Sequence, residues 1–219
     1  MNDEGSAGKS RRGWLAAAAT LALIAVLAGV YVTLWPLGNG QRIAACQGSE
    51  ALAARLRPLA RGEVAALVVA EEPALAAEIA FIDGDGGQRT LSDWAGRAVL
   101  VNLWATWCAP CKREMPALDR LQAELGGGTF EVVAINLDLG GPEKGKRFYE
   151  EIGLENLGYY HDPEANIFRA VNAIGMPTTL LIDENGCEVA RMAGPAEWAS
   201  EDAFALLRAA MAGARSARR

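Results

Sequence analysis

The sequence predicts an α/β fold in which a mixed central sheet is covered by helices on both faces. From residue 78 onward, segments with strand character alternate with segments of helical periodicity, in the order β-α-β-α-β-α-β-β-α. The segment 98–104 (AVLVNLW) is almost continuously apolar, which is typical of a central strand buried on both faces. Near the end, two strand-like segments flank Asn185-Gly186, a dipeptide that predicts an antiparallel hairpin. About 140 residues suffice for one such core.

The expected elements follow one another with clear turn signals. Strands are expected at 79–83, 98–104, 130–138, 159–161, 178–183 and 187–192, and helices at 110–125, 142–152, 164–173 and 198–211. Prolines stand near the starts of the first two helices, and three glycines at 126–128 end the first. The Asp- and Gly-rich segment 84–87 is expected to be a turn, because the later ligands of a calcium loop are missing.

The N-terminal part predicts a membrane anchor. Residues 14–35 form a run of 22 positions without a charge. As a helix this run would span about 33 Å, which is enough to cross a bilayer core of about 30 Å. Lys9, Arg11 and Arg12 precede it, so the positive-inside rule places the N-terminus in the cytoplasm and the bulk of the chain outside it. A cleaved signal peptide, a twin-arginine signal and lipidation of Cys46 fit the pattern less well, and each also exports the bulk of the chain.

Residues 46–70 are rich in Ala, Leu and Arg, with apolar residues at helical spacing. We expect a helix of three to four turns there, followed by a less regular segment that ends near Pro73. The chain is thus expected to have four regions: a cytoplasmic N-terminus (1–13), a transmembrane anchor (14–36), a helical linker or N-terminal extension (37–75) and the α/β domain (76–219).

Composition excludes several classes of function. The net charge is −6, which argues against a nucleic-acid-binding surface. His161 is the only histidine, and this argues against most zinc sites, Ser-His-Asp triads and Cys-His pairs. We therefore expect no metal and no dissociable cofactor. The cysteines carry the chemistry, and there are four: Cys46, Cys108, Cys111 and Cys187.

The most specific motif is Cys108-Ala109-Pro110-Cys111, which directly follows the predicted buried strand and opens a predicted helix. A cysteine at a helix N-terminus meets the positive end of the helix dipole and free backbone N–H groups, which lower its pKa from about 8.5 towards 7 or below. The second sulfur follows one helical turn later, within disulfide reach. Half of a zinc site is the alternative, but such a site needs two further ligands and no second Cys-x-x-Cys is present. The context therefore predicts a redox-active dithiol.

Several segments together resemble the thioredoxin superfamily. They are WATWCAPCKREMP at 104–116, the strand before it, IGMPTT at 174–179, and the hairpin that follows. Within that superfamily, the chain resembles the membrane-tethered, extracytoplasmic branch of TlpA, ResA and CcmG proteins from about residue 75 to residue 211, and GPAEWASED at 194–202 resembles TlpA in particular. The resemblance implies a thioredoxin-like fold. It also implies a thiol–disulfide oxidoreductase that acts as a reductant in the biogenesis of cytochrome oxidase or c-type cytochromes.

The resemblance also implies roles for individual residues. Cys108 would be the attacking thiolate and Cys111 the more buried, resolving thiol. Pro177 would be the cis-proline that lies across from the dithiol, although an ordinary proline at a strand start is the alternative. The Met176 backbone would pair with an incoming peptide, with Trp107 as a further contact.

The acidic residue that this branch carries near its active site is matched by Glu114, three residues after Cys111. Glu114 could shuttle a proton to and from Cys111, or it could be a solvated carboxylate in the first turn of the helix. Six residues before Cys108, Asn102 replaces the buried aspartate of cytoplasmic thioredoxins, and asparagine cannot titrate. A carboxylate relay would therefore fall to Glu114 or to water. The pair Ala109-Pro110 lacks the histidine of strongly oxidising proteins, so we expect a reducing dithiol.

Two cysteines remain, Cys46 and Cys187. Thiols in an oxidising compartment tend to pair. The strand between Pro177 and Cys187 would place Cys187 roughly 20 Å from the dithiol, too far to resolve Cys108. We therefore expect a structural Cys46–Cys187 disulfide that links the N-terminal helix to the far end of the sheet.

The resemblance finally implies a cellular setting. The protein would be a monomer in the bacterial inner membrane, with its catalytic domain in the periplasm. Its client would carry a disulfide and be a copper chaperone, an oxidase copper subunit or apocytochrome c. A membrane electron donor similar to DsbD or CcdA would reduce it again. A Cu(I)-binding assembly factor is the alternative function, but factors of the Sco type use Cys-x-x-x-Cys with a distant histidine. A peroxidase is disfavoured because Asn102 stands where its motif requires proline.

Overall fold

The computed structural model describes residue 23 and residues 45–216, and the latter lie in one compact unit. Apart from Leu23, the predicted cytoplasmic N-terminus (1–13) and anchor (14–36) lie outside the described residues. None of the helices in the described ranges combines the length and apolar character needed to cross a bilayer. The division into four regions therefore stays a prediction.

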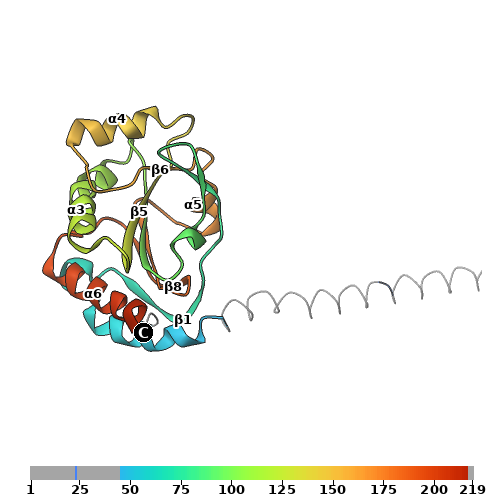
Figure 1. Cartoon of the computed structure of the whole chain (residues 1–219), viewed down its shortest axis with the longest axis vertical. Helices are drawn as coiled ribbons and strands as arrows, with labels where there is room; N and C mark the ends of the chain where they lie inside the picture. Colours follow the sequence, from blue (N-terminus) through green and yellow to red (C-terminus); the bar gives the residue numbers. More distant parts are fainter. Residues whose placement is uncertain (1–22, 24–44, 217–219) are drawn as a thin grey trace, which may run out of the picture. The chain divides into compact units, whose positions relative to one another are not determined.

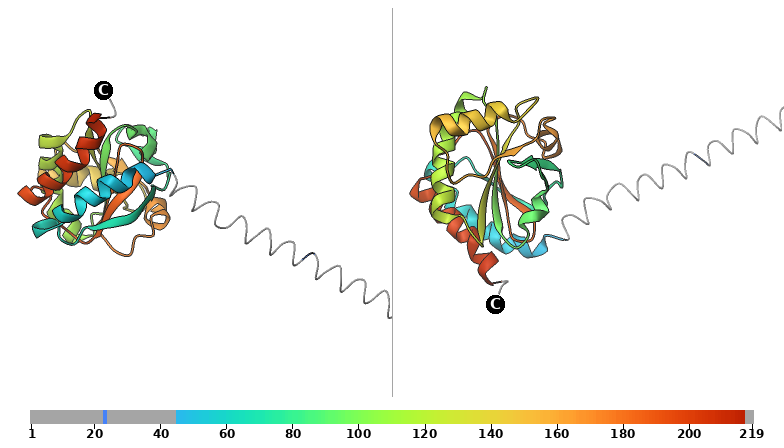
Figure 2. Two further views of the ribbon diagram at one scale, coloured as in Figure 1. Left: turned by 90° about the horizontal axis from the view of Figure 1, so that it is seen from below. Right: turned by 45° about the horizontal axis from the view of Figure 1, so that its top comes forward.

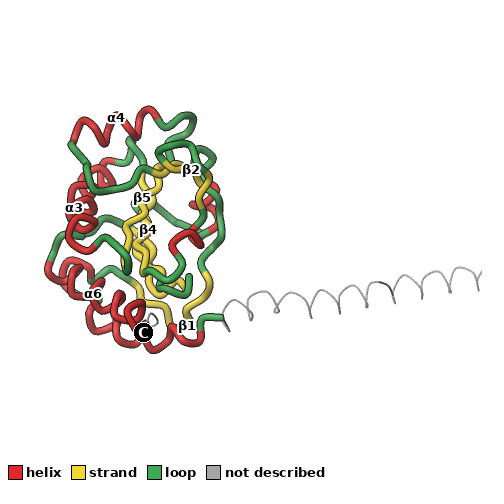
Figure 3. Tube along the Cα trace, in the orientation of Figure 1, coloured by secondary structure: helices red, strands yellow, loops and turns green. Residues whose placement is uncertain are grey.

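An eight-stranded mixed sheet forms the centre of this unit (Figures 1 and 3). Its strands are Val68–Leu75 (β1), Phe81–Asp83 (β2), Gln88–Arg89 (β3), Ala98–Trp104 (β4), Phe130–Asn136 (β5), Tyr160–His161 (β6), Thr178–Ile182 (β7) and Cys187–Ala193 (β8). They lie in the order β1-β8-β7-β4-β5-β6-β2-β3. Strand β4 is parallel to β5 and antiparallel to β7, and β7 forms the predicted hairpin with β8. The predicted mixed α/β fold is confirmed.

The helices cover the two faces of the sheet unequally. The described helices are Glu50–Leu56 (α2), Ala109–Leu125 (α3), Glu143–Ile152 (α4), Asn166–Ala170 (α5) and Glu201–Ser216 (α6), with short 3-10 turns at Gln47–Ser49 (η1), Arg57–Leu59 (η2), Gly62–Val64 (η3) and Leu91–Trp94 (η4). Figure 2 shows α3 and α6 on one side of the sheet and α5 on the other.

Strand β4 supplies the core of both faces because successive side chains point to opposite sides. Leu100 and Trp104 belong to a cluster with residues of α2, α3 and α6. Val101 and Leu103 belong to a second cluster with residues of η4 and α5. All seven residues of β4 are buried, which explains its almost continuously apolar sequence. The one polar member, Asn102, faces the side of α3 by this alternation.

The segment before the domain differs from the expectation. The helix predicted after Cys46 is present, but its α-helical part is only seven residues long and 3-10 turns flank it. Pro58 is the second residue of the later turn (η2), and Gly62, with φ of +54°, interrupts the helical path again. The segment that follows forms β1, a strand that the sequence pattern does not predict. It pairs with β8 at the edge of the sheet, and the ladder is irregular between Val69 and Ala74, around Pro73.

A disulfide joins Cys46, just before η1, to Cys187 at the start of β8, with a Cα–Cα distance of 5.8 Å. Both residues are buried. Next to it, the hydroxyl of Ser49 donates a hydrogen bond to the carboxylate of Asp183, a buried residue in the turn between β7 and β8. The N-terminal helical segment is thus attached to the hairpin by one covalent and one polar contact.

Candidate active site

The dithiol lies where β4 runs into α3. Cys108 is the N-cap residue of α3, and its sulfur accepts a hydrogen bond from the backbone N–H of Cys111 at 3.3 Å. In this structure the two sulfurs form a disulfide, with a Cα–Cα distance of 5.3 Å. Cys108 is 5% exposed, whereas Cys111 is completely buried. Cys108 is therefore the more accessible of the two residues, and it stands at the positive end of the α3 dipole.

The loop before Cys108 is held by Asp138, which the sequence reasoning did not single out. The carboxylate of Asp138 accepts hydrogen bonds from the backbone N–H and the hydroxyl of Thr106 at 3.0–3.2 Å. A third comes from the Asn136 side chain at 3.0 Å. The available signal was positional. Asp138 follows β5, and because β5 is parallel to β4, their carboxyl ends meet at the same edge of the sheet.

The segment before β7 lies at the same end of the sheet. The Met176–Pro177 peptide bond is cis, and Pro177 is buried. Thr178, the next residue, pairs with Leu103 of β4, so the strand register places Pro177 beside the β4 end that leads to the dithiol. Met176 is partly buried and packs against both hydrophobic clusters.

Exposed apolar side chains lie close in sequence to the residues of this site. Trp107, the neighbour of Cys108, is 69% exposed, and Ile174, three residues before Pro177, is 91% exposed. Leu139, the neighbour of Asp138, is 75% exposed. Large apolar side chains that stay in water beside a reactive group are typical of a surface that binds a partner.

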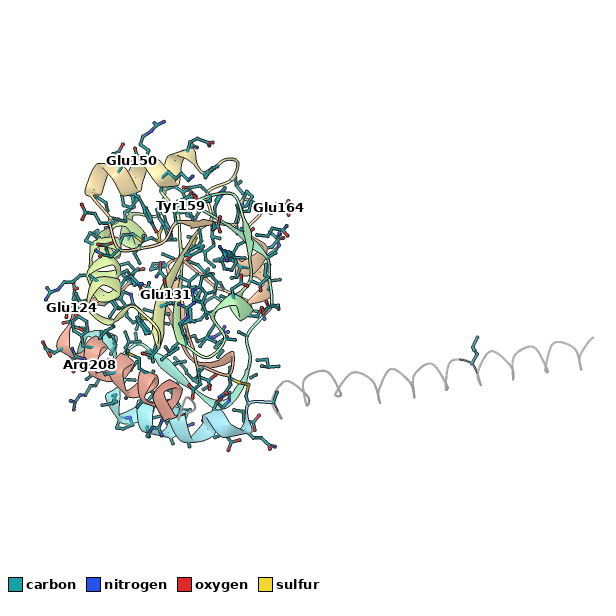
Figure 4. All side chains as sticks on the ribbon, viewed as in Figure 1. Glu124, Glu131, Glu150, Tyr159, Glu164 and Arg208 are labelled. Carbon is teal, nitrogen blue, oxygen red and sulfur yellow. A yellow bond between two sulfur atoms is a disulfide. The ribbon has the colours of Figure 1, made fainter. Side chains whose placement is uncertain are left out.

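Glu114 is the one carboxylate of α3 that is buried. Glu124, Glu150 and Glu164 lie at the surface (Figure 4), but Glu114 is only 4% exposed. One of its oxygens accepts a hydrogen bond from the Asn102 side chain at 2.7 Å. The other accepts from the Ala196 backbone at 3.2 Å and from the Trp198 indole at 3.3 Å. The alternative of a solvated first-turn carboxylate is therefore wrong.

Burial dominates the protonation of Glu114. Removal from water raises its pKa from 4.5 to about 7, although the hydrogen bonds from Asn102, Ala196 and Trp198 act in the opposite direction. A carboxyl group with this pKa is both a useful acid and a useful base near neutral pH. Glu114 follows Cys111 by three residues on the same helix, so the two lie on the same helix face.

The raised pKa predicts a specific dependence of stability on pH. Between pH 4.5 and about 7 the folded protein keeps a proton on Glu114 that the unfolded chain has released, so the free energy of unfolding falls as pH rises through this window. The loss amounts to about 3 kcal/mol. Glutamine has no proton to exchange in this window. The difference in free energy of unfolding between wild type and Glu114→Gln should therefore change by that amount as the pH rises from 4.5 to about 7. Urea unfolding of the oxidised proteins at a series of pH values measures it, and a constant difference would contradict it.

The only histidine has a structural contact. His161 is buried in β6, and its Nε2 atom lies 2.8 Å from the backbone oxygen of Asp138. Within residues 45–216 and residue 23, no group of three or more His, Cys, Asp or Glu side chains is arranged to hold a metal ion.

Comparison with known proteins agrees with this geometry. The Redoxin family profile matches residues 70–207. The chain is 36% identical over 112 residues to the thiol-disulfide oxidoreductase ResA of Geobacillus kaustophilus (strain HTA426), a match that covers 51% of this chain and 63% of the relative. The ResA protein of Bacillus subtilis (strain 168) is 32% identical over 106 residues, covering 48% and 57%. The chain thus spans less than two thirds of the length of these curated relatives.

A solved structure extends the likeness to the fold. The crystal structure of a protein described as a thiol:disulfide interchange protein DsbE, from Chlorobium tepidum, matches with a TM-score of 0.57 and 31% identity. The match covers 63% of this chain and 95% of that one. The sheet, the dithiol at the start of α3 and a family match over more than half of the sequence lead to one conclusion: the chain has a thioredoxin-like fold and belongs to the Redoxin family.

Proposed function

We propose that this protein is a thiol–disulfide oxidoreductase that reduces disulfides of client proteins through Cys108 and Cys111. The observation that carries the proposal is the unequal placement of the two cysteines: Cys108 caps α3 and keeps a small exposed area, whereas Cys111 is completely buried. The similarity to ResA and DsbE proteins supports the same chemistry.

The reaction begins with the reduced protein. The Cys108 thiolate attacks one sulfur of the client disulfide, a mixed disulfide forms, and the second client sulfur leaves as a thiolate. Cys111 then loses its proton and attacks the Cys108 sulfur, which releases the first client sulfur. Two electrons have passed to the client, and the Cys108–Cys111 disulfide remains, as in this structure. Glu114 is the group proposed to take the proton from Cys111, because burial brings its pKa to about 7.

The client is proposed to bind across the exposed end of the sheet. Trp107 offers an apolar surface beside Cys108. The Met176 backbone, held by Pro177, offers peptide groups for pairing with an extended client segment. Glu114, Cys111 and the buried face of Pro177 lie behind this surface rather than on it.

The proposed setting follows from the N-terminal sequence and the family resemblance. Residues 14–36 would anchor the protein in the bacterial inner membrane, with the domain in the periplasm as a monomer. A DsbD- or CcdA-like membrane protein would return electrons to the dithiol. The client would be a copper chaperone, an oxidase copper subunit or apocytochrome c, so the protein would act in cytochrome biogenesis.

A trapping experiment tests this function and identifies the client. In Cys111→Ser the mixed disulfide on Cys108 cannot be resolved, so we expect covalent complexes that disappear on reduction. The full-length variant is expressed in cells and its partners are identified by mass spectrometry, with Cys108→Ser/Cys111→Ser as the control. Assembly proteins of cytochromes or copper sites captured only by the single variant support the proposal. An empty trap, with copper in the purified wild-type protein, would favour Cu(I) carriage instead.

A further inference from the structure

The loop between β8 and α6 reaches back to the active-site helix. Its residues 194–200 separate Ala193, the end of β8, from Glu201, the start of α6. Two hydrogen-bond donors of this loop, the Ala196 backbone N–H and the Trp198 indole N–H, bind the same oxygen of Glu114. Trp198 is completely buried and belongs to the same hydrophobic cluster as Cys108 and Cys111. The loop is thus anchored by a large apolar side chain whose polar edge faces the carboxylate.

Both of these groups can only donate. An indole N–H and a backbone N–H have no lone pair to offer, so neither can accept a hydrogen bond from a protonated carboxyl group. The oxygen of Glu114 that faces them, Oε2, is therefore favoured without a proton. This arrangement opposes burial, which favours the neutral acid.

The other oxygen, Oε1, has a different kind of partner. The Asn102 carboxamide donates one N–H to this oxygen and the other to the hydroxyl of Thr179 at 3.0 Å. The Asn102 carbonyl oxygen is buried and, within the described part of the chain, has no hydrogen-bond partner. If this carboxamide turns over, its free oxygen can accept a hydrogen bond from a proton on Oε1. The proton can therefore bind to Oε1, beside Asn102, while Oε2 keeps its hydrogen bonds from Ala196 and Trp198.

Among the residues that the structure describes, no charged side chain is paired with Glu114. The groups that meet Glu114 are neutral: Asn102 on β4, and Ala196 and Trp198 in the loop, while Cys111 on α3 is held in the disulfide. Thr179 on β7 is reached only through Asn102. Glu197, between the two loop donors, is exposed and accepts a hydrogen bond from the Ala199 backbone. Hydrogen-bond donors, and not ion pairs, therefore balance the burial of this carboxylate.

We propose that Trp198 is a positioning residue of the dithiol reaction, whose indole N–H holds Glu114 on the Cys111 face of α3 and stabilises its ionised form. The loop between β8 and α6 then sets the pH at which Glu114 exchanges its proton. This inference rests on the proton-carrying role of Glu114 proposed above. It also explains why a tryptophan is buried here. An aromatic side chain without an N–H would fill the same space in the core but would donate no hydrogen bond to the Glu114 carboxylate.

The test is the titration of Glu114 in Trp198→Phe. The oxidised protein is labelled with ¹³C at glutamate carboxyl groups and titrated by NMR, and Glu114→Gln identifies the resonance. Loss of one hydrogen bond to the charged form should raise the pKa of Glu114 by about one unit. The midpoint of the pH profile of client-disulfide reduction should rise by the same amount, because the ionised carboxylate accepts the proton from Cys111.

A matched control is present in the same hydrophobic cluster. Trp104 is also completely buried, but within the described residues its indole N–H has no hydrogen-bond partner. Trp104→Phe therefore makes a similar loss of volume without a lost hydrogen bond, and it should leave the titration of Glu114 unchanged. A shift in Trp198→Phe alone supports the proposal, whereas no shift, or an equal shift in both variants, would overturn it.

Two further measurements separate the possible failures. If Trp198→Phe does not fold, as judged by near-ultraviolet circular dichroism, Asn102→Leu removes the donor on the other oxygen and should shift the pKa of Glu114 in the same direction. An unchanged pKa of Glu114 in Asn102→Leu would overturn the inference that hydrogen-bond donors stabilise its ionised form. If Glu114→Gln keeps the wild-type pH profile of exchange, the proton-carrying role fails, while the titration still decides whether Trp198 holds the carboxylate.

Discussion

Cys108→Ser is expected to lower the rate of client-disulfide reduction by several orders of magnitude, to the uncatalysed background. Only a thiolate attacks a disulfide, and a serine hydroxyl neither ionises near neutral pH nor forms a stable bond to sulfur. Removal of the nucleophile in other enzymes with covalent intermediates has effects of this size. The measurement is the rate at which the pre-reduced protein reduces a disulfide-bonded peptide.

The comparison with Cys111→Ser makes this expectation specific. That variant keeps the nucleophile, so it should react once, form the mixed disulfide and stop. If Cys108→Ser formed a mixed disulfide with the client and Cys111→Ser did not, the order of attack would be reversed. The burial of Cys111 behind Cys108 would then have to change before the reaction begins.

The second large effect is expected from the Cys46–Cys187 disulfide. The double variant Cys46→Ala/Cys187→Ala should lose about 3–5 kcal/mol of the free energy of unfolding. The bond joins residues 141 positions apart. In the chain-entropy model, closing such a long loop lowers the entropy of the unfolded chain and so adds about 5 kcal/mol to the free energy of unfolding. Alanine avoids a buried, unpaired hydroxyl, since both cysteines are buried. Urea unfolding of the oxidised proteins measures the loss.

The other disulfide provides the control. Cys108 and Cys111 are only three positions apart, so the same model assigns their bond about 2 kcal/mol. Cys108→Ala/Cys111→Ala should therefore be destabilised less than Cys46→Ala/Cys187→Ala. Equal losses in the two double variants would contradict a structural role for Cys46–Cys187 that depends on loop length.

Elements that depend on neighbouring residues could be predicted from the sequence, whereas elements that depend on pairing with distant segments could not. Strand β4 matches its predicted bounds because its apolar pattern is local, and α3 and the β7–β8 hairpin were indicated by their own proline, glycine and turn signals. Strand β1 was missed because its pairing with β8 joins segments more than 100 residues apart. Strand β3 was missed because its two residues carry no apolar pattern and are defined only by their pairing with β2.

The candidate site divides in the same way. Cys108 and Cys111 were found because their spacing and their place between a strand and a helix are visible in consecutive residues. Asp138 and Trp198 were not assigned a role, since each acts on a residue that lies far from it in the sequence. For Glu114 the sequence allows two alternatives, a proton shuttle near Cys111 or a solvated carboxylate, because a side chain in the first turn of a helix can face either water or the core.

By itself, then, the sequence determined the class of the fold, the dithiol and its position at a helix N-terminus, since these depend on short-range periodicity and on the chemistry of neighbouring residues. Only the tertiary structure decided that Glu114 is buried and held by donors from β4 and from the loop before α6. The physical reason is that burial and hydrogen bonding depend on which distant segments pack together. These two quantities determine the protonation of a carboxyl group.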